Sequence, residues 1–196
     1  MKRFDVTLKG ITPLLHHRMT EEALFSLLGA KTKKKKSDAV KTPREIAEEH
    51  AYKTIDGHYF IPLSYVSGAF AHVASDYKQS NSQRKSYKAI AGGVFRPLTE
   101  SATIVDPDSG RELDNFEVDI RKATNHKAGA VAVCRPRFDK WGCQFQISIN
   151  TDLLPADTAL QILNDAGQRS GIGSFRVSKG GYFGQFSVTH FEPATD

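Results

Sequence analysis

Apolar and polar residues alternate in several stretches of the chain, and this alternation predicts β-strands. In residues 4–11, the apolar side chains of Phe4, Val6 and Leu8 fall on one face of an extended chain. Side chains of a strand point alternately to its two faces, so this pattern is typical of a sheet with one face on a core. Further strands are predicted at residues 102–105, 143–149 and 185–191.

Other stretches carry apolar residues at helical spacing. Residues 63–75 are predicted to form an amphipathic helix. Gly68 inside this helix costs about 1 kcal/mol relative to alanine, which predicts a close contact with another backbone or with a ligand. A second helix is predicted to start at Pro155 and to end at Gly167. Shorter helices are predicted at residues 21–28 and 45–52.

A long β-hairpin is predicted at residues 116–138, where two strand-like runs flank a polar turn. Phe138 and Trp141 lie at its end, so cations and aromatic rings together could hold a nucleic-acid strand through phosphate contacts and base stacking. The alternative is that Trp141 belongs to the core and that the cations form an ordinary solvated face. The cations of the hairpin are Arg121, Lys122, Lys127, Arg135 and Arg137.

Length and charge narrow the class of protein. A chain of 196 residues suits a single domain, residues 1–196. Its 27 basic and 22 acidic residues give a formal net charge of +5, and basic proteins meet nucleic acid more often than acidic ones do. Residues 29–57 are predicted to be a flexible basic insertion whose cations contact phosphates without reading sequence. Its lysine cluster includes Lys33, Lys34, Lys35 and Lys36.

The sequence also bears on the cellular compartment. No apolar run approaches the roughly 20 residues that span a bilayer, and the N-terminus begins with a strand instead of an apolar signal-peptide core. We therefore expect a soluble, cytoplasmic protein without a membrane partner. Cys134 and Cys143 flank a predicted strand–turn–strand, a spacing compatible with a disulfide, but reduced thiols are expected in a cytosol.

A glycine-rich segment, residues 170–184, joins the second helix to the last strand. It contains five glycines together with Arg176 and Lys179. Glycine lets a backbone approach a ligand closely, and N–H donors combined with cations suit a phosphate group. The glycines follow a helix instead of opening one, which disfavours a Walker-type nucleotide site and a dinucleotide fingerprint. The alternative is a plain connector between helix and strand.

Two adjacent histidines are the candidates for catalysis. His16 and His17 follow the end of the first strand, and histidine titrates near neutral pH. The sequence assigns them no Ser, Cys or carboxylate partner, so catalysis is not favoured. Asp106 and Asp108 are better explained as turn residues than as metal ligands. We predict no metal site and no cofactor.

The order of elements predicts an α+β fold: a ferredoxin/RRM-like βαββαβ sheet with a long basic insertion and a protruding hairpin. Residues 59–70, YFIPLSYVSGAF, resemble the helix-start motif of the RAMP superfamily of CRISPR-associated proteins. Residues 171–186 resemble the glycine-rich loop of that superfamily, and residues 116–138 lie where its backbone subunits carry a protruding thumb. The chain departs from the motif at Leu63, which replaces a glycine, and at 66–67, where Val-Ser replaces Leu-Lys.

The resemblance implies that the chain binds the backbone of a guide RNA along the helix start, the glycine-rich segment and the hairpin. Arg18, the cations of the hairpin and those of the lysine cluster are predicted to be further phosphate contacts. The positions carried over from the superfamily are Ser64, Ser67, Gly171, Gly173, Arg176, Lys179, Gly180 and Gly181.

Three functions follow from these observations. The favoured one is a non-catalytic RNA-binding subunit of an RNA-guided effector complex in antiviral defence, with other effector subunits, copies of itself and target nucleic acid as partners. The second is a metal-independent, repeat-processing endoribonuclease, in which His16 or His17 helps a 2′-hydroxyl attack its own phosphate and Arg18 or Lys179 stabilises the developing charge. The third is a structural protein of a phage or mobile element with the same fold.

Overall fold

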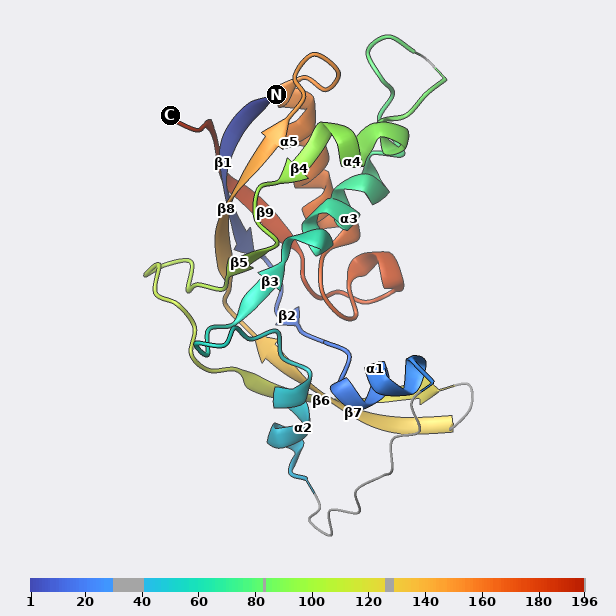
Figure 1. Cartoon of the computed structure of the whole chain (residues 1–196), viewed down its shortest axis with the longest axis vertical. Coiled ribbons are helices and arrows are strands. Elements are labelled where there is room, and N and C mark those ends of the chain that lie inside the picture. Colours follow the sequence, from blue (N-terminus) through green and yellow to red (C-terminus); the bar gives the residue numbers. More distant parts are fainter. Residues whose placement is uncertain (30–40, 83, 126–128, 196) are drawn as a thin grey trace.

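The computed structural model describes residues 1–29, 41–82, 84–125 and 129–195 and shows a mixed α+β fold (Figure 1). Its main sheet has the strand order β4-β8-β1-β9, and every pairing is antiparallel. The central strands are β1 (Lys2–Gly10) and β8 (Gly142–Ile149), and the edge strands are β4 (Phe95–Pro97) and β9 (Phe186–Pro193). The strands predicted at residues 4–11, 143–149 and 185–191 are therefore confirmed.

Helices cover one face of the main sheet (Figure 1). The helix predicted at residues 63–75 is α3 (Leu63–Val73), and its apolar stripe is buried. Behind it lies α5 (Ala156–Asp165), which contacts both α3 and β9. Phe4, Val6 and Leu8 of β1 are buried on the helix-covered face, as their alternation predicts. Two short elements, η1 (Tyr87–Ile90) and α4 (Ala91–Val94), lead into β4.

The predicted hairpin is confirmed as β6 (Glu117–Asn125) and β7 (Gly129–Phe138), and it projects away from the main sheet (Figure 1). The short strand β2 (Leu14–Leu15) pairs with β7, which fastens the hairpin to the end of β1. A further two-stranded sheet pairs β3 (Phe60–Pro62) with β5 (Ser101–Thr103).

Two short helices lie near the hairpin. The helix predicted after Thr20 is α1 (Glu21–Leu27), and the Thr20 hydroxyl accepts a hydrogen bond from the Ala23 amide, a typical N-cap. The helix α2 (Pro43–Glu49) begins with a capping box and contacts both hairpin strands. It falls within the predicted basic insertion 29–57, so the described part of that insertion includes a helix packed on the core. Lys33, Lys34, Lys35 and Lys36 lie outside the described residues.

One prediction about a glycine is wrong, and another is contradicted in one of its two alternatives. Gly167 does not end α5, because the chain continues through one π-helical turn, η2 (Ala166–Ser170), and leaves the helix at Gly171, whose φ is 66°. Gly167 instead allows a close contact with β9, since a Cβ at this position would lie 2.1 Å from the Phe186 carbonyl oxygen. Gly68 makes no close contact with another backbone, because nothing lies within 4 Å of the place its Cβ would take; its contact with a ligand stays a prediction.

The aromatic residues at the hairpin end belong to the core. Trp141 is 0% exposed, Phe138 is 2% exposed, and the Trp141 indole N–H donates to the Thr12 carbonyl oxygen at 2.8 Å. Base stacking on these two rings is therefore excluded in this fold, and the prediction that Trp141 belongs to the core is confirmed. Cys134 and Cys143 are buried free thiols, and burial raises the pKa of Cys143 to about 12. Within the described ranges, no helix has the length and apolar character needed to cross a membrane.

Candidate functional site

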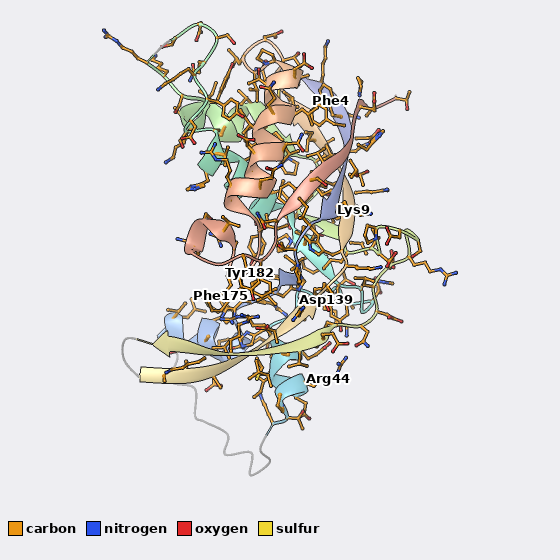
Figure 2. The ribbon with its side chains drawn as sticks, turned by 180° about the vertical axis from the view of Figure 1, so that it is seen from behind. Phe4, Lys9, Arg44, Asp139, Phe175 and Tyr182 are labelled. Carbon is orange, nitrogen blue, oxygen red and sulfur yellow. The ribbon has the colours of Figure 1, made fainter. Side chains whose placement is uncertain are left out.

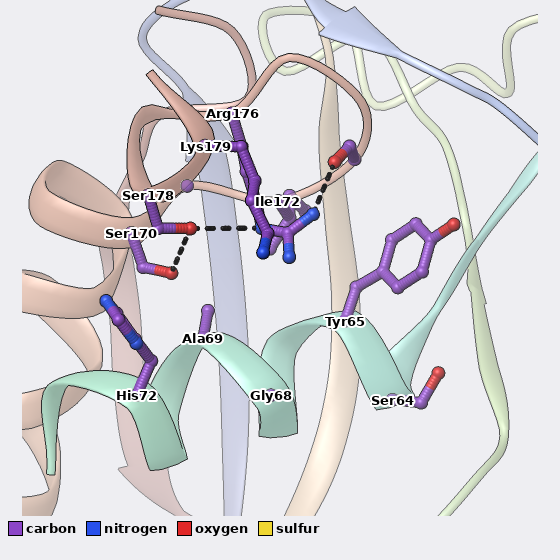
Figure 3. Close-up of a pocket in the computed structure, with 12 residues that line it drawn as sticks. Ser64, Tyr65, Gly68, Ala69, His72, Ser170, Ile172, Arg176, Ser178 and Lys179 are labelled. Carbon is purple, nitrogen blue, oxygen red and sulfur yellow. Dashed lines mark hydrogen bonds between the residues drawn. The ribbon is translucent and has the colours of Figure 1, made fainter. Parts of the chain in front are cut away.

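The α3 helix and the glycine-rich segment together line a groove with a cavity volume of about 290 Å³ (Figure 3). Ser64, Gly68 and His72 line one wall. They are four residues apart, so they follow one another along the same side of the helix. The other wall comes from η2 and the loop after it, which contribute Arg176 and Lys179. Two segments about 100 residues apart in the sequence therefore form a single site, which we call the α3–loop groove.

Glycines at two positions allow the loop to fold against its neighbours. Gly173 has a φ of 79°, and a Cβ there would lie 2.6 Å from the Leu15 carbonyl oxygen. The next amide, that of Ser174, donates to the same oxygen at 2.9 Å and fastens the loop to β2. A Cβ at Gly181 would lie 1.7 Å from the Phe175 carbonyl oxygen, so the loop can close on itself only with glycine there.

The groove is positively charged. Arg176 is half-buried, and its Nε and Nη1 donate to the Ser178 hydroxyl and to the Gly173 carbonyl oxygen, each at 3.1 Å (Figure 3). Within the described part of the chain, no hydrogen bond joins its Nη2 to the protein. Lys179 is exposed and forms no ion pair with a described residue. The lining contains no carboxylate, so an anion in the groove would meet two cations and no like charge.

The residues carried over from the superfamily divide into two groups. Those that line the groove are Ser64, Gly171, Gly173, Arg176 and Lys179. Ser67, Gly180 and Gly181 lie outside the lining. The structure adds His72, Tyr65, Ser170 and Ser178, which the sequence analysis had not assigned to the site. His72 could have been found from its spacing of eight residues from Ser64.

Two hairpin arginines predicted to contact RNA face the protein instead. Arg135 is only 5% exposed, donates from Nε to His17 Nδ1 at 3.0 Å, and lies 4.6 Å from the centre of the Phe175 ring. Arg121 donates from Nε to both carboxylate oxygens of Asp119, at 2.8 and 2.9 Å. Its guanidinium also lies 4.6 Å from the centre of the Phe183 ring. We therefore remove Arg135 from the set of RNA contacts, because almost none of its surface can meet a ligand.

The remaining predicted cations lie away from the groove. Lys122 and Arg18 are exposed, and Arg137 is half-buried in an ion pair with Asp139 at 2.6 Å. None of the three is part of the groove lining. Lys127, like the lysine cluster, lies outside the described residues.

The two candidate catalytic histidines are poorly placed for acid–base chemistry. His16 is 1% exposed, its Nδ1 accepts from the Tyr52 amide at 3.2 Å, and burial lowers its pKa to about 3. His17 is exposed, but desolvation, followed by the charges of His50 and Arg135, lowers its pKa to about 4. Both imidazoles are thus neutral and weakly basic at neutral pH, and His16 has no surface to offer an RNA.

Metal binding finds no support in the described ranges of the chain, where no group of three or more His, Cys, Asp or Glu residues is placed to hold an ion. Asp106 behaves as the turn residue it was predicted to be: its carboxylate accepts hydrogen bonds from the amides of Asp108 and Ser109. No model of a known protein family matches the sequence, and no curated protein matches it either. The site is therefore interpreted from its own chemistry.

Proposed function

We propose that this chain is a ferredoxin-like, RAMP-type protein that binds the sugar–phosphate backbone of single-stranded RNA in the α3–loop groove. The main sheet supports the fold assignment. Its order β4-β8-β1-β9, with α3 between β1 and β4 and α5 between β8 and β9, agrees with the arrangement expected of a βαββαβ unit. The strands β2, β3, β5, β6 and β7 are then additions to that unit.

The composition of the groove carries the proposal. Arg176 and Lys179 supply positive charge, while hydroxyls of Ser64, Ser170 and Ser178 supply hydrogen-bonding groups. Arginine and lysine beside hydroxyl groups are the usual partners of phosphate and sugar oxygens. Because no carboxylate lines the groove, the phosphate is favoured over a cationic ligand.

Backbone binding is favoured over base recognition. Apart from the imidazole of His72, the one aromatic side chain in the groove lining is Tyr65, whose hydroxyl is hydrogen-bonded to the Tyr52 hydroxyl at 2.6 Å. Burial and that bond raise the pKa of Tyr65. On the open face of the main sheet, a shallow hollow is lined by polar residues of β1 and β8, such as Thr7 and Gln144. The lining of this hollow includes no exposed Phe, Tyr or Trp ring, the kind on which RRM-type sheets stack bases; Phe145 is buried, and the exposed ring is the imidazole of His190.

The role we favour is that of a non-catalytic guide-RNA subunit in an RNA-guided ribonucleoprotein effector, working with other subunits and with copies of itself. An endoribonuclease that uses His16 and His17 is disfavoured by the burial of the first and the low pKa of both. A structural protein of a phage or mobile element would share the fold without binding RNA, and measurement of RNA binding separates it from our proposal.

The test is RNA affinity as a function of salt. For single strands, the slope of log K against log salt is about −0.7 per phosphate neutralised. Lys179→Gln is expected to weaken binding and to reduce the magnitude of this slope by about 0.7. Lys2→Gln removes the same charge from an exposed site outside the groove and serves as the control. Absence of RNA binding by the unmodified protein at low salt, or equal slopes for both variants, would overturn the proposal.

A further inference from the structure

Phe175 adopts an unusual backbone conformation next to the groove. Its φ is 50°, and it is the one non-glycine residue with positive φ in the described ranges. This left-handed region is unfavourable for a residue with a Cβ and persists when its surroundings hold it in place. Because Phe175 immediately precedes Arg176, its backbone conformation sets the direction in which the arginine leaves the loop.

The surroundings of Phe175 hold it from two sides. Its carbonyl oxygen accepts from the Phe183 amide at 3.2 Å and lies against Gly181, inside the loop. Its ring faces the hairpin, where the Arg135 guanidinium lies 4.6 Å from the ring centre. Figure 2 shows Phe175 and Tyr182 on the part of the loop that is turned toward the hairpin.

The side chain of Arg135 is buried in its contact with the Phe175 ring. Asp119 lies opposite it in the register of β6 and β7, and both side chains are buried. The Nη1 atom of Arg135 has no hydrogen-bond partner within the described part of the chain. A buried guanidinium with an unpaired nitrogen needs an explanation, and the ring face of Phe175 supplies one, because an aromatic face attracts a desolvated cation. Arg121 makes the equivalent contact with Phe183.

We propose that Arg135, supported by Arg121, is a positioning residue that clamps the glycine-rich loop to the hairpin and so holds Arg176 in the groove. Arg135 does not touch RNA. Without the clamp, Phe175 relaxes toward negative φ, and Arg176 loses its fixed direction. The effect of the clamp on RNA binding rests on the proposed function, whereas the effect of the clamp on the loop does not depend on RNA.

Trypsin tests the clamp directly, because it cleaves after Arg176 and Lys179, which lie in the loop itself. In Arg135→Gln, we expect cleavage at these two sites to accelerate about two- to thirtyfold, the range that a cation–π contact provides. Native-state cleavage follows the population of the open loop when opening and closing are fast. Arg137→Gln is the control, because it removes a cation from the same strand without touching the loop.

A second variant keeps the test decisive if Arg135→Gln folds poorly. Phe175→Leu keeps an apolar side chain but removes the ring face, and it should accelerate the same cleavages. The double variant R135Q/F175L should show no further acceleration, because both changes break one contact. If both single variants are cleaved at the unmodified rate, or if their effects simply multiply, the clamp is refuted.

RNA binding then distinguishes a positioning role of Arg135 from a direct contact between Arg135 and RNA. Arg135→Gln should lower RNA affinity, because Arg176 is no longer held in the groove, and Arg135→Lys should restore part of the affinity. In an Arg176→Gln background, Arg135→Gln should leave the salt slope unchanged, and a further reduction by about 0.7 would show that Arg135 itself neutralises a phosphate, which overturns the inference. If the unmodified protein binds no RNA, the proposed function fails, while the trypsin result still decides whether the clamp exists.

Discussion

Gly68 allows the stability of α3 to be separated from the function of its groove. It lies in the middle of the helix, is exposed, and has nothing within 4 Å of the place its Cβ would take. Alanine at this position should therefore stabilise the fold by about 0.5–1 kcal/mol, the usual difference in helix propensity. For a chain of this size, that gain raises Tm by about 1–4 °C.

Gly68→Glu should gain most of the same helix propensity while placing a carboxylate in the groove. Two like charges about 4 Å apart repel by about 1 kcal/mol in water and about 4 kcal/mol near a protein surface. A bound phosphate should therefore lose at least about fivefold in affinity. The expected outcome is a protein that is at least as stable as the unmodified chain and binds RNA poorly.

The assay pairs thermal unfolding with fluorescence anisotropy of labelled single-stranded RNA for G68A, G68E and a control. Gly93→Glu is the control, because Gly93 is also exposed in a helix, has nothing within 4 Å of a Cβ, and lies outside the groove. RNA binding by G68E that equals that of G93E would show that RNA does not occupy the groove. A loss of stability in G68A would refute the account of Gly68.

Two further predictions concern residues of the core. His16 has a pKa of about 3 in the folded chain, so the unfolded state binds the extra proton as pH falls below about 6.5. His16 alone should make the free energy of unfolding fall by about 1.4 kcal/mol per pH unit between those values. Urea unfolding of His16→Asn, which can still accept from the Tyr52 amide, should show a dependence on pH that is shallower by that amount, and an equal slope would contradict it. Trp141→Ala should lower the free energy of unfolding by about 3–5 kcal/mol in denaturant titrations, whereas a loss of RNA affinity at unchanged stability would mean that Trp141 stacks on bases after all.

Local patterns in the sequence were sufficient for most of the elements. Alternation in residues 4–8 identified the buried face of β1, and helical spacing identified the buried stripe of α3. Both patterns repeat within a few residues, because each reflects the geometry of one element on one core. The hypothesis that Arg176 and Lys179 bind phosphate also came from the sequence, since it depends on residue type and on the glycines around them, and it stays a prediction.

Contacts between distant segments were decided by the tertiary structure alone. The sequence shows that Arg135 is a cation on a strand, but its burial against Phe175 depends on how the hairpin and the glycine-rich loop pack. His16 is buried because β2 pairs with β7 and turns this side chain toward Tyr52. Periodicity tells which face of an element is apolar, whereas the partner of each polar side chain is set by segments far away in the chain.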